Sequence, residues 1–209
     1  MNSKIGKYGT LLTGICVFVF AISMILSLIS KNSWTFLSYF SCMFLAIGYV
    51  MFACSIYSLN KNNDKKSLGI IGVAFSIIYC VLIFLVYYAQ CTTVNLNSSL
   101  GNESLSIIDF SKLGSLFFNY DLLGYGIMAL STFFLSFIVD TENNKNKILQ
   151  KLLLIHGIFF PSCFIVPMFP IFNANTGNVV GTILLEIWCV YFLPICILGY
   201  KYFKNNEER

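Results

Sequence analysis

Six long apolar runs constrain this chain more than any other feature of its sequence. They cover residues 10–29, 34–59, 68–89, 122–139, 148–172 and 179–203. A helix rises about 1.5 Å per residue, so roughly 20 apolar residues cross the roughly 30 Å hydrocarbon core of a bilayer. Only 11% of the 209 residues are charged, whereas soluble domains carry about 25%. We therefore predict one all-α domain over residues 1–209, a bundle of six transmembrane helices.

The first run has a second interpretation, a secretory signal peptide, because Lys4 and Lys7 precede it. The apolar core of a signal peptide usually has about 7 to 15 residues and is followed by an A-x-A cleavage site. This run is longer and no such site follows it. We therefore expect a membrane span that is retained.

The basic residues predict how the bundle lies in the membrane. In a six-span arrangement only Lys31 and Lys112 fall on one side, and the other eleven fall on the opposite side, at positions 4, 7, 61, 65, 66, 145, 147, 151, 201, 204 and 209. Positive charge resists translocation, so the lysine-rich side is cytoplasmic. We expect a multi-pass protein of the cell membrane with cytoplasmic N- and C-termini. The net charge of +4 then requires no nucleic-acid partner.

The eight cysteines form no metal or redox motif. All but Cys91 lie within apolar runs and none forms a C-x-x-C pair; they stand at positions 16, 42, 54, 80, 91, 163, 189 and 196. A structural zinc site needs four closely spaced cysteine or histidine ligands, and the chain has one histidine. We expect small apolar thiols in the bundle, and no metal or cofactor.

Small residues repeat every four positions in the first three runs: Gly6–Thr10–Gly14, Ser38–Cys42–Ala46 and Gly72–Ser76. This spacing allows helix backbones to approach closely. We expect these residues to pack helices of the same chain together, although a dimer contact would use the same motif.

The longest connector, residues 90–121, is expected on the outer side of the membrane. In its second half Ile107, Phe110, Leu113 and Phe117 recur at near-helical spacing, which predicts an amphipathic helix over residues 104–118. Such a helix lies on the membrane surface with its apolar face toward lipid. It could instead fold down over the bundle as a lid, and the sequence leaves both arrangements open.

Few polar side chains interrupt the apolar runs, and their spacing places them on single helix faces. Because an ionised group in hydrocarbon costs several kcal/mol, such residues usually face the bundle interior and often mark function. On the third and fourth runs the predicted interior faces are Ser76–Tyr79–Ile83–Gln90 and Asp121–Tyr125–Met128–Thr132. On the fifth and sixth runs they are His156–Phe160–Cys163–Pro167–Pro170 and Thr182–Glu186–Leu193–Tyr200.

Depth in the membrane groups these side chains further. Glu186 lies about 10 Å below the outer end of its run at 1.5 Å per residue, level with the polar ends of the third and fourth runs. His156 lies about 12 Å from the cytoplasmic end of its run, so a direct His156–Glu186 pair is not expected. We predict a polar cup in the outer half of the bundle, with no catalytic set. Its candidate ligand-binding residues are Glu186, Asp121, Gln90, Tyr125 and Tyr87, and His156 is a further candidate outside the cup.

Three prolines, Pro161, Pro167 and Pro170, break the fifth run in its middle and outer half. Each lacks an N–H and clashes with the carbonyl four residues back. Irregular backbone at membrane depth is tolerated where protein or a water-filled cavity satisfies it, and transporter sites are often built from broken helices. A cavity for a ligand and a plain packing kink are both consistent with this pattern.

The segment "FSKLGSLFFNYDLLGYGIMALSTFF", with "YYAQCTTV" before it and "LLIHGIFFPSCFIVPMFPIF" after it, resembles a set of uncharacterised bacterial membrane proteins of about this length. The likeness covers roughly residues 80–200 and implies six spans. By size and span count the chain is also similar to the substrate-capture subunits of energy-coupling-factor vitamin transporters. Those subunits carry an A-x-x-x-A contact motif in the first span, where this sequence has a single alanine, Ala21.

Three classes of function fit these features. The first is a small-molecule or lipid-binding membrane protein, such as a transporter or a transporter subunit, in which the polar cup holds the ligand. The second is a membrane-embedded enzyme that uses Glu186 or His156 as an acid or base, although no nucleophile–base pair or cofactor motif accompanies them. The third is a structural or regulatory partner of another membrane protein, whose buried polar groups only pack. The polar cup favours the first class.

Overall fold

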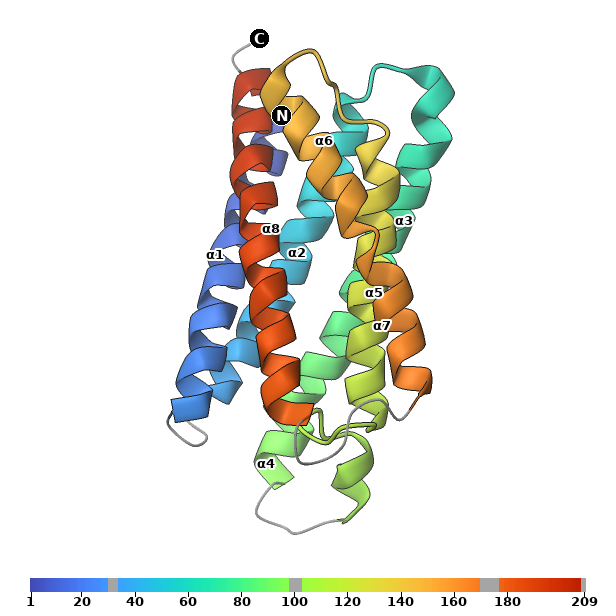
Figure 1. Ribbon diagram of the computed structural model, residues 1–209. Coiled ribbons are helices and arrows are strands. Elements are labelled where there is room, and N and C mark those ends of the chain that lie inside the picture. The colour runs from blue at the N-terminus through green and yellow to red at the C-terminus, as the bar shows by residue number, and fades with distance from the viewer. Residues whose placement is uncertain (30–33, 98–102, 170–176, 208–209) are drawn as a thin grey trace.

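The computed structural model is all helical over the residues it describes, which are 1–29, 34–97, 103–169 and 177–207, with no β-strand in these ranges (Figure 1). The long helices are α1 (Asn2–Ile29), α2 (Thr35–Leu59), α3 (Lys66–Ala89), α5 (Leu116–Ser136), α6 (Asn144–His156) and α8 (Gly177–Glu207). The short elements are α4 (Asn95–Asn97), α7 (Phe159–Ile165), 3₁₀ turns at Asn63–Lys65, Glu103–Ile107 and Val166–Met168, and a π-helical turn at Gln90–Val94. The predicted all-α class is confirmed.

The helices form a closed ring in which each one packs against two neighbours. The order around the ring is α1, α2, α3, α5, then α6 with α7, then α8, which returns to α1. The long helices run lengthwise beside one another, and the two chain termini lie at the same end (Figure 1). Large side chains fill the ring, among them Tyr49, Tyr79, Met128 and Phe192, all fully buried. The ring therefore has one core, which all of its members share.

Five helical segments are long and apolar enough to cross a membrane: Asn2–Ser27, Thr35–Leu59, Asn63–Asn97, Asn144–Met168 and Thr182–Glu207. Helix α5 is not among them, because polar residues such as Asn119, Asp121 and Tyr125 dilute its apolar character. Its 21 residues would still extend about 31 Å. One face of α5 is buried against its neighbours in the ring. The fold is thus compatible with a membrane bundle in which α5 packs its buried face, including Asp121 and Tyr125, against the other helices.

The fifth predicted span is interrupted just before Pro161, which lies in the first turn of α7 (Phe159–Ile165). Helix α6 ends at His156 and α7 begins at Phe159. Pro161 has no N–H for the carbonyl of Gly157, four residues back, and that carbonyl accepts instead from the Phe160 N–H at 3.1 Å. The protein therefore satisfies the freed acceptor, which favours a packing kink at this position. Of the other two prolines, Pro167 lies in the 3₁₀ turn after α7, and Pro170 is outside the described residues.

The connector between α3 and α5 does not form the helix predicted over residues 104–118, so that prediction is wrong. A 3₁₀ turn ends at Ile107, turns follow, and α5 begins only at Leu116. Gly114 has a φ of 78°, a conformation that favours glycine, so it ends any helix that might enter from the connector. Ser115 then caps α5 by accepting from the Phe118 N–H at 3.1 Å.

The apolar residues of the connector do not share one helical face, and their environments differ. Ile108 and Phe110 pack against the core of the ring, whereas Ile107 is 61% exposed. The connector crosses the end of the bundle opposite to the chain termini (Figure 1). We call residues 103–115 the cap. The structure therefore favours a lid-like position for this segment over a helix lying apart on the surface.

The lysines gather at the end of the ring that holds the chain termini. The start of α1, the loop before α3, the start of α6 and the end of α8 all lie there (Figure 1). These four places carry Lys4, Lys7, Lys61, Lys65, Lys66, Lys145, Lys147, Lys151, Lys201 and Lys204. Lys112 lies in the cap at the opposite end, and Lys31 and Arg209 are outside the described residues. The bundle is thus strongly polarised in charge along its axis.

Glycines allow the closest helix contacts of the ring. At the α1–α2 contact, a Cβ atom on Gly48 would lie 2.7 Å from the Gly9 carbonyl oxygen and 2.6 Å from Thr13 Oγ1. The repeat identified in the first run faces α8, where Gly14 meets Cys196. Gly72 of the third run faces Leu135 of α5. The prediction that such small residues pack helices of one chain together is confirmed at these positions.

We expect the Gly48→Ala variant to be destabilised by about 1–3 kcal/mol, because its new methyl group would meet fixed backbone atoms on α1. The matched control is Gly124→Ala, since a Cβ atom there lies at an ordinary 3.5 Å from Ile83 and Leu82 side chains. The measurement is thermal unfolding of the purified proteins in detergent. Equal unfolding temperatures for the two variants would contradict the close α1–α2 contact.

Candidate functional site

A cluster of buried polar side chains lies in the half of the ring next to the cap. We call it the acid–tyrosine cluster; its members are Cys42 of α2, Tyr79 and Tyr87 of α3, and Asp121 and Tyr125 of α5. Each is at most 6% exposed. The Tyr79 and Tyr125 ring centroids are 5.7 Å apart, and Cys42 Sγ lies 3.7 Å from the Tyr125 hydroxyl. The side chains of Tyr87 and Asp121 interact directly. Three helices thus direct hydroxyl, thiol and carboxyl groups into one apolar interior.

Helical spacing explains why these side chains meet. Residues three or four positions apart share a helix face, so one stripe on α3 and one on α5 turn inward together. Every residue of the two stripes predicted from the third and fourth runs is buried: Ser76, Tyr79, Ile83, Gln90, Asp121, Tyr125, Met128 and Thr132. The predicted interior faces of these two helices are therefore confirmed. The structure brings Asp121, Tyr87 and Tyr125 of the predicted cup together.

Two polar atoms of the acid–tyrosine cluster have no hydrogen-bond partner. They are Oδ1 of Asp121 and the hydroxyl oxygen of Tyr79, and both are shielded from solvent. An unsatisfied buried polar group costs about 1–3 kcal/mol, and proteins leave few of them. Such groups are most often explained by an unseen water, an ion or a functional role. The cluster is therefore incomplete as a structural network.

Gln90 has a different role from the one predicted for it. Its side-chain Nε2 donates to the carbonyl oxygen of Ile108 at 2.8 Å, and its Oε1 accepts from the Phe110 N–H at 3.1 Å. The side chain is 3% exposed, and both ends of its amide bond to the cap. Gln90 thus fixes the cap on α3 through one hydrogen bond at each end of its side-chain amide.

The cap brings aromatic rings over the acid–tyrosine cluster. The Phe110 ring centroid lies 5.7 Å from those of Tyr39 and Tyr87, and 6.0 Å from that of Phe118. Tyr39 and Tyr87 are in turn 5.4 Å apart. These rings form a layer between the cluster and the outer surface of the bundle.

A cavity of about 210 Å³ lies beside this aromatic layer, at the cap end of the bundle. Hydroxyl groups and apolar side chains line it together, contributed by α1, α2, the cap, α5 and α8: Met24, Ser27, Thr35, Tyr39, Phe110, Ser111, Leu113, Phe118, Thr182 and Leu185. Tyr39 connects the cavity to the cluster, because it lines the cavity and its ring centroid lies 5.4 Å from that of Tyr87. The cavity and the cluster therefore share one aromatic wall.

His156 lies apart from the acid–tyrosine cluster, at the end of α6, and is fully buried. The indole Nε1–H of Trp188 donates to His156 Nε2 at 2.9 Å. Since Nε2 accepts, the neutral ring carries its proton on Nδ1, which lies 2.8 Å from Thr132 Oγ1. The Thr132 hydroxyl in turn donates to the Ala129 carbonyl oxygen at 2.8 Å. Every polar atom of this chain of bonds has a partner.

The surroundings of His156 are aromatic and contain no charge. The rings of Phe159, Trp188, Tyr191 and Phe192 all lie within 6.3 Å of the imidazole, measured between centroids. Both ring nitrogens are already used to join α6 to α5 and α8. The structure therefore gives His156 a packing role and brings no second acid or base to it.

Glu186 lies on a different face of α8 from the residues that pack into the ring. The buried face of α8 carries Trp188, Cys189, Phe192, Ile195 and Cys196. The interior face predicted for α8 is therefore correct only in part: Thr182 is buried and Leu193 packs against the core, whereas Glu186 and Tyr200 are half-buried. Glu186 instead lines a shallow apolar groove against Ile25 of α1. One carboxyl oxygen is shielded and has no hydrogen-bond partner. The structure does not bring Glu186 to Asp121, Tyr125 or Tyr87.

Several residues of this region escaped the sequence prediction of the site. Tyr79 was placed on an interior face but not in the cup, and Cys42 was assigned to helix packing. Trp188 and Thr132 form hydrogen bonds with His156. The sequence predicts an interior position for Thr132 from its helical spacing, but neither bond. No group of three or more His, Cys, Asp or Glu side chains that suits a metal ion occurs in the parts of the chain described.

Comparison of the chain with protein-family models, with curated proteins and with solved structures found no match.

We expect Thr132→Val to destabilise the bundle by about 1–3 kcal/mol, because it leaves the buried Nδ1–H of His156 without an acceptor. Thr92→Val is the matched control, since the Thr92 hydroxyl is exposed and bonds only within its own turn, to the Tyr88 carbonyl oxygen. That variant should stay within about 0.5 kcal/mol of the parent protein. Thermal unfolding in detergent measures both. An unchanged unfolding temperature for Thr132→Val would mean that the His156 network contributes little.

Proposed function

We propose that this chain is a six-span protein of the cell membrane with both termini in the cytoplasm. The ring of helices, the five segments long and apolar enough to cross a bilayer, and the length of α5 support six spans. The gathering of lysines at the end with the termini supports the orientation, because lysine-rich ends stay on the cytoplasmic side. The cap then lies on the outer side of the membrane.

Cysteine labelling tests this topology. In a Cys91→Ser background, we expect a membrane-impermeant maleimide to label Leu96→Cys on intact cells, since Leu96 is 75% exposed beside the cap. Asn62→Cys, in the exposed loop before α3, should be labelled only after the membrane is opened. The reverse pattern would overturn the orientation, and labelling of both sites on intact cells would overturn the span count.

We further propose that the protein binds a small organic cation from the outer side, as a transporter or as a subunit of one. The observation that carries this proposal is the buried Asp121 carboxyl group with an oxygen that no protein group satisfies. A carboxylate in an apolar interior attracts a positive charge, and aromatic faces bind ammonium groups through cation–π contacts. The cavity lined by Tyr39, Phe110 and Phe118 provides such faces on the outer side.

The alternatives have less support from these contacts. An acid–base enzyme that uses His156 would need a free ring nitrogen, and both are bonded to Thr132 and Trp188. A purely structural partner would have no use for a buried carboxyl oxygen without a partner, which only lowers stability. Buried groups that lower the stability of the fold are typical of functional sites. The proposal therefore moves the central role from Glu186 to Asp121.

The test compares Asp121→Asn with the wild-type protein, and uses Glu186→Gln as a matched control at a second acid within the spans. The probes are small ammonium ions such as tetramethylammonium, with neutral alcohols of similar size as reference solutes. A ligand at about 100 times its Kd stabilises a protein by about 2.7 kcal/mol. We expect the ammonium ions to raise the unfolding temperature of wild type and Glu186→Gln, but not of Asp121→Asn, which folds normally.

Two results would contradict this proposal. One is equal stabilisation of the wild type by the ammonium ions and the neutral alcohols, which would exclude selection for charge. The other is an unchanged response of Asp121→Asn to the ammonium ions, which would show that Asp121 does not take part.

A further inference from the structure

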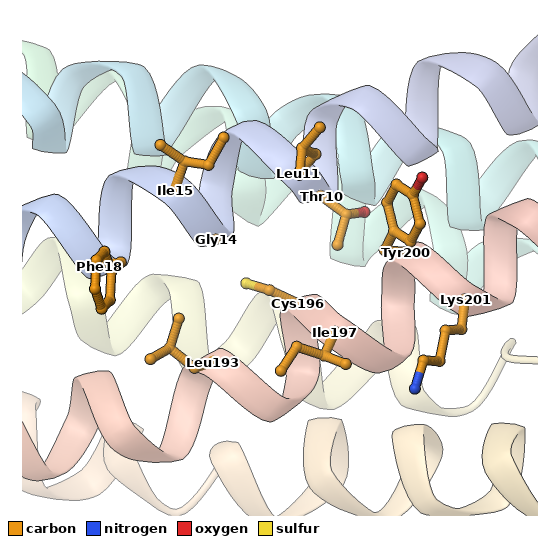
Figure 2. Close-up of a pocket in the computed structure, with 10 residues that line it drawn as sticks. All are labelled: Thr10, Leu11, Gly14, Ile15, Phe18, Leu193, Cys196, Ile197, Tyr200 and Lys201. Atoms are coloured by element: carbon orange, nitrogen blue, oxygen red, sulfur yellow. The ribbon is translucent and has the colours of Figure 1, made fainter.

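A groove of about 410 Å³ lies between α1 and α8, on the outer wall of the ring and away from the acid–tyrosine cluster (Figure 2). From α1 it is lined by Thr10, Gly14 and Phe18, among others, and from α8 by Leu193, Cys196 and Ile197. Tyr200 and Lys201 follow Ile197 at one end of the groove (Figure 2). The groove is thus apolar along its length and polar at one end.

Two small residues of α1 line the floor of this groove, where α1 and α8 pack closely. Gly14 has no side chain, and a Cβ atom there would lie 3.2 Å from the Cys196 Cβ. Thr10 bonds back to its own helix, because its hydroxyl donates to the Gly6 carbonyl oxygen at 2.6 Å. The wall therefore offers methyl and methylene surface and no free hydroxyl from Thr10. An occupant of this part of the groove has to be apolar.

The polar end of the groove lies at the lysine-rich end of the bundle. Lys201 is exposed, and the ion pairs found at this end join Lys4 and Lys7 to Glu207, leaving Lys201 outside them. From Lys201 to Leu193 the groove extends about 12 Å along α8 at 1.5 Å per residue. One leaflet of the hydrocarbon core is about 15 Å thick. The groove therefore spans most of one leaflet, with its charged end at the level of the lipid headgroups.

We propose that this groove binds an anionic phospholipid of the leaflet at the lysine-rich end. One acyl chain lies along Gly14 and Phe18, and the phosphate accepts hydrogen bonds from the Lys201 ammonium group and the Tyr200 hydroxyl. The argument is one of charge complementarity, because anionic headgroups are attracted to basic groups at the membrane surface. The site uses none of the residues proposed to bind a small cation, so either proposal can fail alone.

A transmembrane helix of another protein is the competing occupant of such a groove. Close helix association in membranes depends on small residues at the contact. Along this seam Gly6 and Gly14 already face Phe203 and Cys196 of α8. These small residues are therefore used within the chain, and what remains exposed beside them is bulky, such as Leu11, Ile15 and Phe18. This arrangement favours a flexible acyl chain over a third helix.

Native mass spectrometry of the full-length protein tests the proposal, with phosphatidylglycerol and phosphatidylcholine of identical chains as probes. We expect more phosphatidylglycerol than phosphatidylcholine adducts on the wild-type protein. Lys201→Gln should weaken phosphatidylglycerol binding about fivefold, the effect of one basic group near the surface. It should weaken phosphatidylcholine binding less, because the choline group of that lipid offsets the charge of its phosphate. Lys147→Gln, which removes an exposed lysine from α6 at the same end, is the charge control and should bind phosphatidylglycerol as the wild type does.

A second pair of variants tests the acyl-chain part of the site. Ile15→Trp fills the groove from an exposed position, and Ile22→Trp makes the same change on α1 outside the groove. Ile15→Trp should reduce the adducts of both lipids, while Ile22→Trp should not; their unfolding temperatures show that both variants fold. Equal phosphatidylglycerol binding by wild type and Lys201→Gln, or by wild type and Ile15→Trp, would overturn the proposal. So would a dimer that Ile15→Trp abolishes, because the groove would then hold a second copy of the chain.

Discussion

The bonds of His156 close the ring of helices, and the arrangement of the other parts depends on that closure. Two side-chain hydrogen bonds join α6 to α8: Trp188 donates to His156, and the Tyr191 hydroxyl donates to the Leu152 carbonyl oxygen at 2.6 Å. The same imidazole reaches α5 through Thr132. In a lipid environment helices gain nothing from burying apolar surface against each other, so packing and hydrogen bonds must hold them. A neutral, fully bonded histidine serves this purpose well.

A second bonded seam lies across the ring from the first and positions the acid–tyrosine cluster. The Tyr49 hydroxyl donates to Ser131 Oγ at 2.8 Å, and the Ser131 hydroxyl donates to the Gly72 carbonyl oxygen at 2.6 Å. These bonds tie α2, α5 and α3 together at the middle of the bundle. The same three helices carry the five cluster residues about two to four turns nearer the cap. Asp121 is thus held in place by a satisfied network while its own network remains incomplete.

Helical spacing predicted the parts of this fold that depend on one helix alone. The stripes on α3 and α5 turned inward as predicted, because each carries several polar or aromatic residues in register. On α8 the prediction gave most weight to Glu186, whereas Trp188, Cys189 and Phe192 pack into the ring. The energy of burying large rings outweighed that of shielding one carboxyl group. Side-chain chemistry at one position was therefore a poor guide to the buried face.

The structure of the connector could not be predicted from its own residues, because it depends on residues far away in the sequence. Its apolar spacing fits a helix, yet the Gln90 side chain forms hydrogen bonds with two backbone groups of the cap, the Ile108 carbonyl oxygen and the Phe110 N–H. Gly114 also permits a backbone turn that no helix contains. Neither bond partner can be identified from the connector alone. Likewise, the His156 partners Thr132 and Trp188 come from two other helices, and only the closed ring brings them within reach.

In the six-span arrangement proposed above, the polar residues of α5 have a consequence for how the chain enters the membrane. Synthesis proceeds from the N-terminus, so α1, α2 and α3 are made before α5. Asp121 and Asn119 make insertion of α5 alone into lipid unfavourable, because polar groups at membrane depth are costly without partners. Tyr87 on α3 and Tyr49 on α2 are already present when α5 is made, and they offer its polar face a protein surface. Helices α2 and α3, which contact the polar face of α5, are therefore made before α5 itself.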